Sequence, residues 1–432
     1  GGENMNVAIF TVGSNPLPIY VVAKYLLDNS RGDVENLPVP DEMVFVFSKN
    51  TEEYYKKLRL KLRNLAGSNN LLDINLGDKE RDREIVQNAV KFKLENLISG
   101  KEHINSIHLH YSGGTKPMSV FSYVAVEEFG KKHGIKTIYS DLDPEQSFIR
   151  IGNETYPIGR DLRDCIKLNI NEIFELHNMT IDNSGSQTYT FPNINIKDFS
   201  SNAIRSFNTL RSKNEPNWKL KINKMKNKIE NYYETKHKPN LPKNEIEKFS
   251  EDFNIVQQEF GKKLMPVKWQ DVASNPQLFT DFVEFFHGKW LEDYVLDALL
   301  SLQQKLKIDE IKKSVKAMYK RRPCEIDVIA MRGYQMHYFT CTTSKDIKKV
   351  KGKAFEALYR AEQLGGSHAR VIVVSLLPSI QNPREFDHCI ENLEKDLSSF
   401  EAQIEKKVKL IGSNVLEDPA LLSKEIENIF LS

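Results

Sequence analysis

The sequence predicts an α/β protein of more than one domain, with a doubly wound parallel sheet near its start and a second α/β unit in its last third. Three observations lead to this prediction. Short apolar runs alternate with helical stretches through the first 160 residues, and the last third returns to a similar alternation. A chain of 432 residues is also too long for one ordinary hydrophobic core.

The first domain is expected to hold five parallel strands joined by crossover helices. The apolar runs that predict the strands are 6–12, 43–48, 71–76, 107–112 and 136–142. The helical stretches among them are 52–65, 80–98 and 117–132. Nearly continuous apolar runs are typical of strands covered on both faces, which favours a doubly wound sheet. A small hairpin is expected over 147–159.

The middle of the chain, about 160 to 275, is less regular. Its segment 211–248 carries 11 Lys and Arg against 5 Asp and Glu. Such a segment is either a solvated helix and linker or a patch that follows a nucleic-acid backbone. In the second interpretation Trp218, Tyr232 and Tyr233 are stacking surfaces.

The last third is expected to begin with a long helix over 279–303. Strands follow near 310–317, 324–331 and 336–342, then a helix at 346–364 and strands at 370–376 and 406–411. This order predicts a three-stranded meander followed by an α-β crossover.

Composition narrows the class of protein. With 28% charged and 40% hydrophobic residues, the chain is expected to be globular and soluble, and a net charge of +2 favours no particular partner. Four cysteines without CxxC spacing indicate neither a zinc site nor a disulfide framework. We find no membrane-length apolar run and no signal peptide, so we expect a cytoplasmic protein without membrane contact.

A glycine-rich loop follows the fourth predicted strand. The stretch "HYSGGTKPMSV" places Ser112, Gly113, Gly114, Thr115 and Lys116 between that strand and a helix. Glycines allow the backbone to approach a ligand closely, and a helix N-terminus next to a lysine favours the binding of an anion. The loop therefore predicts phosphate binding, although a plain strand-to-helix turn is the alternative.

A second loop, "TVGSNPLPIY", follows the first predicted strand. Loops after neighbouring parallel strands meet at one crevice, so Gly13, Ser14 and Asn15 are candidate contacts of the same ligand.

Acidic residues mark a second candidate site in the last third. Glu292 lies among positions that the helical spacing predicts to be packed, where an unpaired carboxylate is costly. Asp327 lies on a predicted strand, in "CEIDV", and the next strand ends in "TCTTS". Acids on one strand beside the end of its neighbour are typical of metal-dependent nucleases.

These motifs resemble the CARF (CRISPR-associated Rossmann fold) sensors, in particular the group fused to a PD-(D/E)xK restriction-endonuclease-like domain. The resemblance rests on the first-strand loop, on "GGTKPM" and on the segment "LNINEIFELHN" at 168–178. It implies a CARF domain over 5–165, a connecting region over 166–275 and a nuclease-like domain over 276–432.

The resemblance also implies partners and ligands. It implies a homodimer that holds one cyclic oligoadenylate, most often cyclic tetra-adenylate, across its two CARF pockets. Glu292 in "GKWLE" and Asp327 map to metal-binding positions for Mn²⁺ or Mg²⁺.

The chain departs from this family on the second nuclease strand. Relatives usually carry Glu-x-Lys there, whereas this chain has Thr340, Cys341 and Thr342. The threonine hydroxyls can hold a water but supply no charge. Lys353 and Glu356 on the next helix are candidates to replace the lost pair, unless that polar face is only solvated.

Three functions follow from these observations. The leading hypothesis is a nuclease that cyclic oligoadenylate activates to cut DNA or RNA, as an ancillary effector of type III CRISPR defence. The alternative is a catalytically degenerate protein that senses or sequesters the cyclic nucleotide, or grips nucleic acid without cutting. A third hypothesis is cleavage of the ligand in its own pocket, near Ser112, Thr115 and Lys116.

Overall fold

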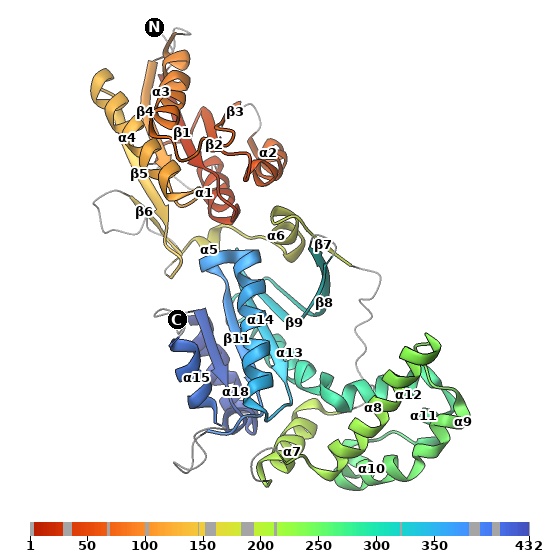
Figure 1. Cartoon of the computed structure of the whole chain (residues 1–432). Coiled ribbons are helices and arrows are strands. Elements are labelled where there is room, and N and C mark those ends of the chain that lie inside the picture. Colours follow the sequence, from red (N-terminus) through yellow and green to blue (C-terminus); the bar gives the residue numbers. More distant parts are fainter. Residues whose placement is uncertain are drawn as a thin grey trace.

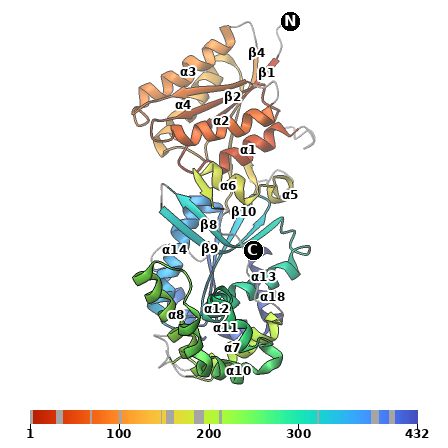
Figure 2. The same ribbon diagram turned by 90° about the vertical axis from the view of Figure 1, so that its right-hand side faces the viewer.

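The computed structural model describes residues 4–28, 37–66, 70–99, 103–145, 147–151, 161–182, 194–210, 214–319, 322–379, 389–399 and 407–431. Two α/β units are stacked one above the other, and a group of helices flanks the lower end of the second unit (Figure 1, Figure 2). Each unit is built on a six-stranded sheet.

The first sheet has the strand order β3-β2-β1-β4-β5-β6. Its strands are β1 (Asn4–Thr11), β2 (Glu42–Phe47), β3 (Asn70–Asn75), β4 (His103–His110), β5 (Lys136–Leu142) and β6 (Ile149–Ile151). The first five are parallel, and β6 pairs with β5 in the antiparallel sense. The five predicted strands are confirmed to within a few residues, but the rest of the predicted hairpin lies outside the described residues.

Helices cover both faces of the first sheet. They are α1 (Leu17–Leu27), α2 (Glu52–Ala66), α3 (Arg83–Ser99) and α4 (Lys116–His133). Successive side chains of β1 point to opposite faces, so Ala8 and Phe10 pack in the cluster that holds α1 and α2, whereas Val7 and Ile9 pack with α3 and α4. This is the arrangement expected of a doubly wound sheet.

The second sheet has the order β12-β11-β10-β9-β8-β7. Its strands are β7 (Met179–Ile181), β8 (Glu310–Tyr319), β9 (Arg322–Arg332), β10 (Gln335–Thr342), β11 (Arg370–Ser375) and β12 (Val408–Ile411). Strands β8, β9 and β10 form an antiparallel meander, and β11 lies parallel to β10 after α14 (Ile347–Gly365). The predicted meander and crossover are confirmed. The short strand β7 was not predicted, and it belongs to the segment expected to connect the domains.

The second sheet packs against helices on both faces. Beyond α14 these are α13 (Trp290–Leu302), α15 (Ile390–Ser398), α17 (Ser413–Leu416) and α18 (Pro419–Leu431). On β11, Val371 and Val373 face the cluster that holds α14, whereas Ile372 and Val374 face the cluster that holds α13 and α18.

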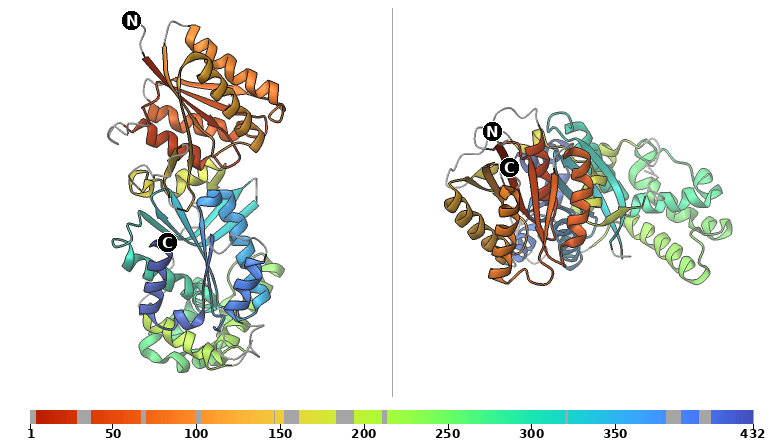
Figure 3. Two further views of the ribbon diagram at one scale, coloured as in Figure 1. Left: turned by 90° about the vertical axis from the view of Figure 1, so that its left-hand side faces the viewer. Right: turned by 90° about the horizontal axis from the view of Figure 1, so that it is seen from above.

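The flanking group of helices is inserted between β7 and β8. It comprises α7 (Ile196–Asn208), α8 (Asn217–Lys236), α9 (Lys243–Ile246), α10 (Ser250–Leu264), α11 (Trp269–Ser274) and α12 (Pro276–Glu284). Seen from above, it projects to one side of the two stacked sheets (Figure 3). Its apolar core is continuous with the α13 face of the second sheet. None of the described helices combines the length and apolar character that crossing a bilayer requires.

Two sequence predictions differ from the structure in this region. The helix expected over 279–303 is broken by a π-helical turn (Phe285–Lys289) that separates α12 from α13. Gly288 lies in that turn with non-helical backbone angles. Trp218, considered as a stacking surface, is wholly buried and donates a hydrogen bond to Ser206 Oγ, so it presents no face to a base.

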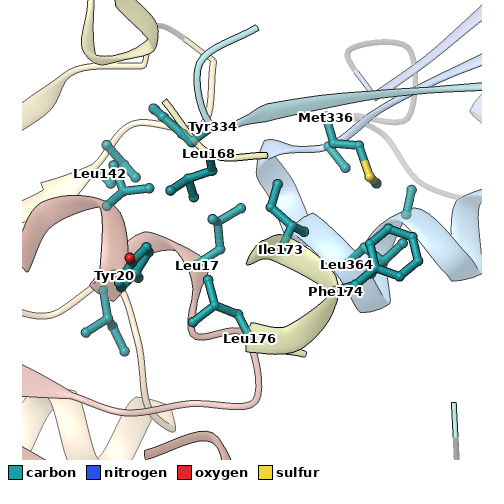
Figure 4. Packing of buried hydrophobic residues seen from close by; sticks show 14 of the residues in the cluster. Leu17, Tyr20, Leu142, Leu168, Ile173, Phe174, Leu176, Tyr334, Met336 and Leu364 are labelled. Carbon is teal, nitrogen blue, oxygen red and sulfur yellow. The ribbon is translucent and has the colours of Figure 1, made fainter. Parts of the chain in front are cut away.

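A short linking segment joins the two sheets through apolar contacts. It contains α5 (Leu162–Cys165) and α6 (Ile170–Leu176). Figure 4 shows Leu168, Ile173 and Phe174 between side chains of the first unit and those of the second. One buried cluster therefore runs from α1 to α14 without interruption.

A polar contact adds to this junction. Asn15 Oδ1, in the loop after β1, accepts a hydrogen bond from Leu17 N and lies 3.1 Å from His177 Nε2. On the other side, a Cβ added at Gly366 would lie 2.2 Å from Asn15 Nδ2, so the end of α14 is closely packed against Asn15.

We expect the free energy of unfolding to fall as the pH drops below about 6.5, because buried histidines resist protonation. Burial lowers the pKa of His177 to about 4 and that of His368 to about 3, from an ordinary value of 6.5. These folded-state values lie below the unfolded one, so the stabilisation is complete above pH 6.5 and is lost as the pH falls toward 4.

The expected loss is roughly 2 kcal/mol for each histidine near pH 5, and urea unfolding near pH 7 and near pH 5 measures it. His177→Gln should show a shallower pH dependence than the parent, and an unchanged slope would contradict this account.

Candidate functional site

The first candidate site lies where β1 and β4 pair at the centre of the first sheet. The helices that follow these two strands pack on opposite faces, so a crevice is expected at their carboxyl ends. The loop after β1 and the loop after β4 both lie there. These are the two loops that the sequence singled out.

The two loops are in direct contact. A Cβ added at Gly13 would lie 2.8 Å from Gly114 N, and one added at Gly113 would lie 2.2 Å from Thr11 O. Thr11 Oγ1 donates a 2.7 Å hydrogen bond to Gly113 O. Gly114 has a φ of +76°, which a residue with a side chain adopts only with strain. Glycine is therefore required here for the loops to meet at all.

In the loop after β4, the hydroxyl groups of Ser112 and Thr115 bond to the backbone, whereas Lys116 points to solvent. Ser112 Oγ accepts a 2.7 Å hydrogen bond from Leu142 N, and Thr115 Oγ1 accepts one from Met118 N and caps α4. Lys116 is the first residue of α4, and its side chain is exposed. A lysine added to the positive end of a helix makes this edge of the crevice attractive to an anion.

In the loop after β1, the residues likewise differ in their surroundings. Ser14 is exposed, whereas Asn15 makes the contacts with His177 and Gly366 described above. Gly13 and Ser14 thus stay predicted ligand contacts beside Lys116. Asn15 has a demonstrated packing role, and its part in ligand binding stays a prediction.

The second candidate site is centred on Asp327, in β9. Its Oδ2 accepts hydrogen bonds from Cys341 N at 2.7 Å and from Thr340 Oγ1 at 3.3 Å. Lys353 Nζ, from α14, lies 3.9 Å from the same oxygen and donates a 3.1 Å hydrogen bond to Cys341 O. The predicted residues Asp327, Thr340 and Lys353 are therefore brought together.

Glu292, in the first turn of α13, lies close to this group. It is 7% exposed, and burial followed by the charge of Asp327 raises its pKa to about 7. Its carboxylate accepts hydrogen bonds from Lys289 Nζ at 3.1 Å and Ser314 Oγ at 3.2 Å. Lys289 also donates to Glu325 at 2.9 Å. Burial opposes the charge of Lys289, but Glu292 and Glu325 outweigh it and raise the pKa of its ammonium.

The two carboxylates have the character of a site for a hard divalent cation. The charge of Asp327 disfavours ionisation of Glu292, and a cation between them would relieve that repulsion. Mg²⁺ is commonly held by one or two carboxylates together with waters. Within the part of the chain that the structure describes, no group of three or more His, Cys, Asp and Glu side chains could hold a metal. Two neighbouring carboxylates are fewer ligands than a full metal cage, so the binding of a metal ion by Glu292 and Asp327 stays a prediction.

A cavity of about 430 Å³ opens beside these groups. Glu292, Thr342, Lys349 and Lys353 line one side of it. Glu356, the other candidate to replace the lost pair, is exposed on α14 and is not among the residues lining the cavity. The catalytic roles of Glu356 and Lys353 both stay predictions, and of these two only Lys353 lines the cavity.

The opposite side of the cavity comes from residues that the sequence did not single out for this site. They are supplied by α8 and the residue Glu215 before it, by the end of α12 and by the π-helical turn: Glu215, Lys219, Asn223, Asn227, Glu284, His287 and Lys289. For Lys289, the glycine in "HGKW" within an otherwise helical pattern was a usable signal. For the residues of α8 no local signal exists, because their proximity depends on how the inserted helices fold back.

Comparison with known proteins agrees with this architecture. No protein-family model matches the chain, and no curated protein matches it in sequence. Among solved structures, protein VC1899 from Vibrio cholerae has a TM-score of 0.59 at 15% identity, covering 99% of this chain and 98% of its own. Can2 from Sulfobacillus thermosulfidooxidans, solved in complex with cyclic tetra-adenylate, has a TM-score of 0.59 at 12% identity, covering 98% and 99%. At such identities the likeness is one of fold, and it extends over the whole chain.

Gly113→Ala is expected to destabilise the protein by about 3 kcal/mol, because the new methyl group would overlap Thr11 O and Ile19. Gly352→Ala is the matched control: a Cβ there meets nothing within 4 Å, and alanine favours the helix. Chemical denaturation of both variants measures the difference. Equal stabilities would show that the two loops are not tightly packed.

Proposed function

We propose that this protein is a metal-dependent nuclease that cyclic oligoadenylate activates, acting as an ancillary effector of type III CRISPR defence. The observation that carries the proposal is the shared fold, over the whole chain, with a protein solved in complex with cyclic tetra-adenylate. In this proposal residues 5–165 form the CARF sensor, 166–275 the connecting region and 276–432 the PD-(D/E)xK nuclease-like domain.

The part of the proposal that concerns the ligand is supported by the two loops at the carboxyl ends of β1 and β4. A cyclic oligoadenylate presents a ring of phosphates, and this edge of the sheet offers two touching glycine loops beside Lys116 at the N-terminus of α4. Ser112 and Thr115 use their hydroxyl groups to hold the loop in shape. A ring of even symmetry suits a homodimer in which two such pairs of loops face each other across a two-fold axis.

The catalytic half is supported by the cluster around Asp327. Glu292 and Asp327 would hold Mn²⁺ or Mg²⁺, which supplies a polarised water and neutralises charge on a phosphodiester. Thr340 and the Cys341 backbone fix the orientation of Asp327. Lys353, 3.9 Å from Asp327, would stabilise the negative charge that develops on the phosphate as the bond is cut.

A second candidate function is also favoured by a specific observation. Lys289 bonds Glu292 and Glu325, and Lys353 lies against Asp327, so the carboxylates already have lysine partners. Together with Thr340 and Thr342 in place of Glu-x-Lys, this pairing fits a degenerate site in a protein that only senses or sequesters cyclic oligoadenylate. Nuclease assays with and without metal separate the two functions.

Asp327→Ala should abolish cutting of single-stranded DNA, RNA and plasmid in the presence of Mn²⁺ and cyclic tetra-adenylate. Lys353→Ala should lower kcat by about 10²- to 10³-fold, the scale of a lost electrostatic donor. Lys351→Ala is the matched control, because Lys351 pairs with Asp396 instead of approaching Asp327. Should Asp327→Ala cut as well as the parent, the catalytic half is wrong.

Lys116→Ala should weaken the binding of cyclic tetra-adenylate by at least about tenfold, the effect of losing a charge-assisted contact to phosphate. Lys131→Ala, at the other end of α4 and paired with Glu127, should bind as the parent does. Isothermal titration calorimetry gives both affinities and the stoichiometry, which is expected to be one ring for two chains. Equal affinities of the two variants would remove Lys116 from the ligand site.

A further inference from the structure

The inserted helix α8 presents two different faces to its surroundings. One is apolar and packs in the core of the helical group, through Trp218, Ile222, Met225 and Ile229. The other is a polar row at intervals of one helical turn, Lys219, Asn223 and Asn227, and all three line the cavity beside Glu292 (α8 in Figure 2). Lys219 is buried, Asn223 is half-buried and Asn227 is exposed, so the row leads from the interior toward solvent.

Lys219 is an unusual residue to find in the wall of a cavity. It is 3% exposed, and among the described residues its only hydrogen-bond acceptor is the carbonyl oxygen of His287. An ammonium group has three N–H donors, so two of them lack an acceptor within the described part of the chain. Glu215 and Glu284 act on it only from a distance, and burial lowers the pKa of Lys219 to about 8 in spite of them. A buried cation with unused donors is costly unless an anion joins it.

Asn223, one turn further along α8, also has unused bonding capacity. Its Nδ2 donates a 2.6 Å hydrogen bond to Glu215 Oε2. Its Oδ1 is buried and has no partner among the described residues. The wall of the cavity therefore offers unused donors at Lys219 and an unused acceptor at Asn223, which is the pattern of a surface that a polar ligand completes.

The cation is fixed next to the strand on which the usual lysine is missing. The carbonyl oxygen of His287 that accepts from Lys219 also accepts a 3.2 Å hydrogen bond from Thr343 Oγ1. Thr343 directly follows Thr342, the last residue of β10. Lys219 is thus tied, through one shared acceptor, to the end of β10 and faces the cavity that Glu292 and Lys353 line from the other side.

We propose that Lys219 binds a phosphate oxygen of a nucleic-acid strand in this cavity and so adds, from the inserted helix, a second cation to the one that Lys353 provides. Asn223 accepts a hydrogen bond from a sugar hydroxyl or a base N–H group of the same strand. The inference rests on the proposed function, because it assumes that the cavity receives nucleic acid. It assigns the inserted helices a role as one wall of the substrate site.

The test measures binding separately from cutting. Fluorescence anisotropy with labelled oligo(dT) and oligo(rU), in EDTA and over a series of salt concentrations, gives the affinity and its salt dependence for the parent, Lys219→Met and Lys219→Arg. Lys224→Met is the control, because Lys224 lies on the same helix but pairs with Asp252 outside the cavity. Thermal unfolding of each variant checks that it is folded.

We expect Lys219→Met to bind about tenfold more weakly, with a slope of log K against log salt shallower by about 0.7, the value for one lost contact to a single strand. Lys219→Arg should recover part of the affinity, and Lys224→Met should bind as the parent does. A merely structural role for Lys219 would leave the slope unchanged, and that result overturns the proposal.

If Lys219→Met does not fold, Asn223→Asp replaces it in the binding test. Asn223 is only half-buried, so this variant is expected to fold. The added carboxylate should repel phosphate and weaken binding about tenfold relative to Asn223→Ala. Equal binding by these two variants would also overturn the proposal. Failure of the proposed nuclease is distinguishable, because a parent protein that binds oligonucleotide without cutting it still tests Lys219.

Discussion

The apolar side chains of the segment that leaves the first sheet hold the two α/β units in one arrangement. Leu168, Ile173 and Phe174 are buried in a cluster that includes α1 on one side and α14 on the other. Each such side chain contributes on the order of 1.5–3 kcal/mol by its burial. Both candidate sites depend on this cluster, because the loop after β1 leads into α1 at one end of it and Lys353 is carried by α14 at the other.

Much of this fold could be predicted from the sequence, for a physical reason that differs between its parts. Buried parallel strands are apolar on both faces, so β1 to β5 appear as short uninterrupted runs and their ends were placed within a few residues. The helix over 279–303 was predicted without its break, since only Gly288 signals the π-helical turn. Strand β7 has three residues, too few for any periodicity, and its pairing with β8 is a long-range contact.

One residue of the second candidate site was predictable because its chemistry conflicts with local burial. Glu292 stood out because a carboxylate among apolar helical positions needs a partner, and it is indeed buried beside Lys289. Lys219 gave no such signal, since a lysine in a lysine-rich helix is normally solvated. Trp218 was wrongly considered as a stacking surface because it lies in a basic segment. It shares an apolar helix face with Ile222, and both side chains are buried. The position of α8 beside the π-helical turn follows from tertiary packing, which periodicity does not encode.

The close packing of Asn15 against Gly366 has a mechanical consequence. A methyl group at Gly366 would lie 2.2 Å from Asn15 Nδ2, so the loop after β1 cannot move toward the end of α14 without displacing it. Helix α14 has 19 residues and is therefore a stiff rod about 28 Å long. Its C-terminal end packs against the loop after β1, and Lys353, nearer its N-terminus, lies 3.9 Å from Asp327. A displacement of the loop after β1 would therefore be passed along α14 to Lys353, so this one helix connects the two candidate sites.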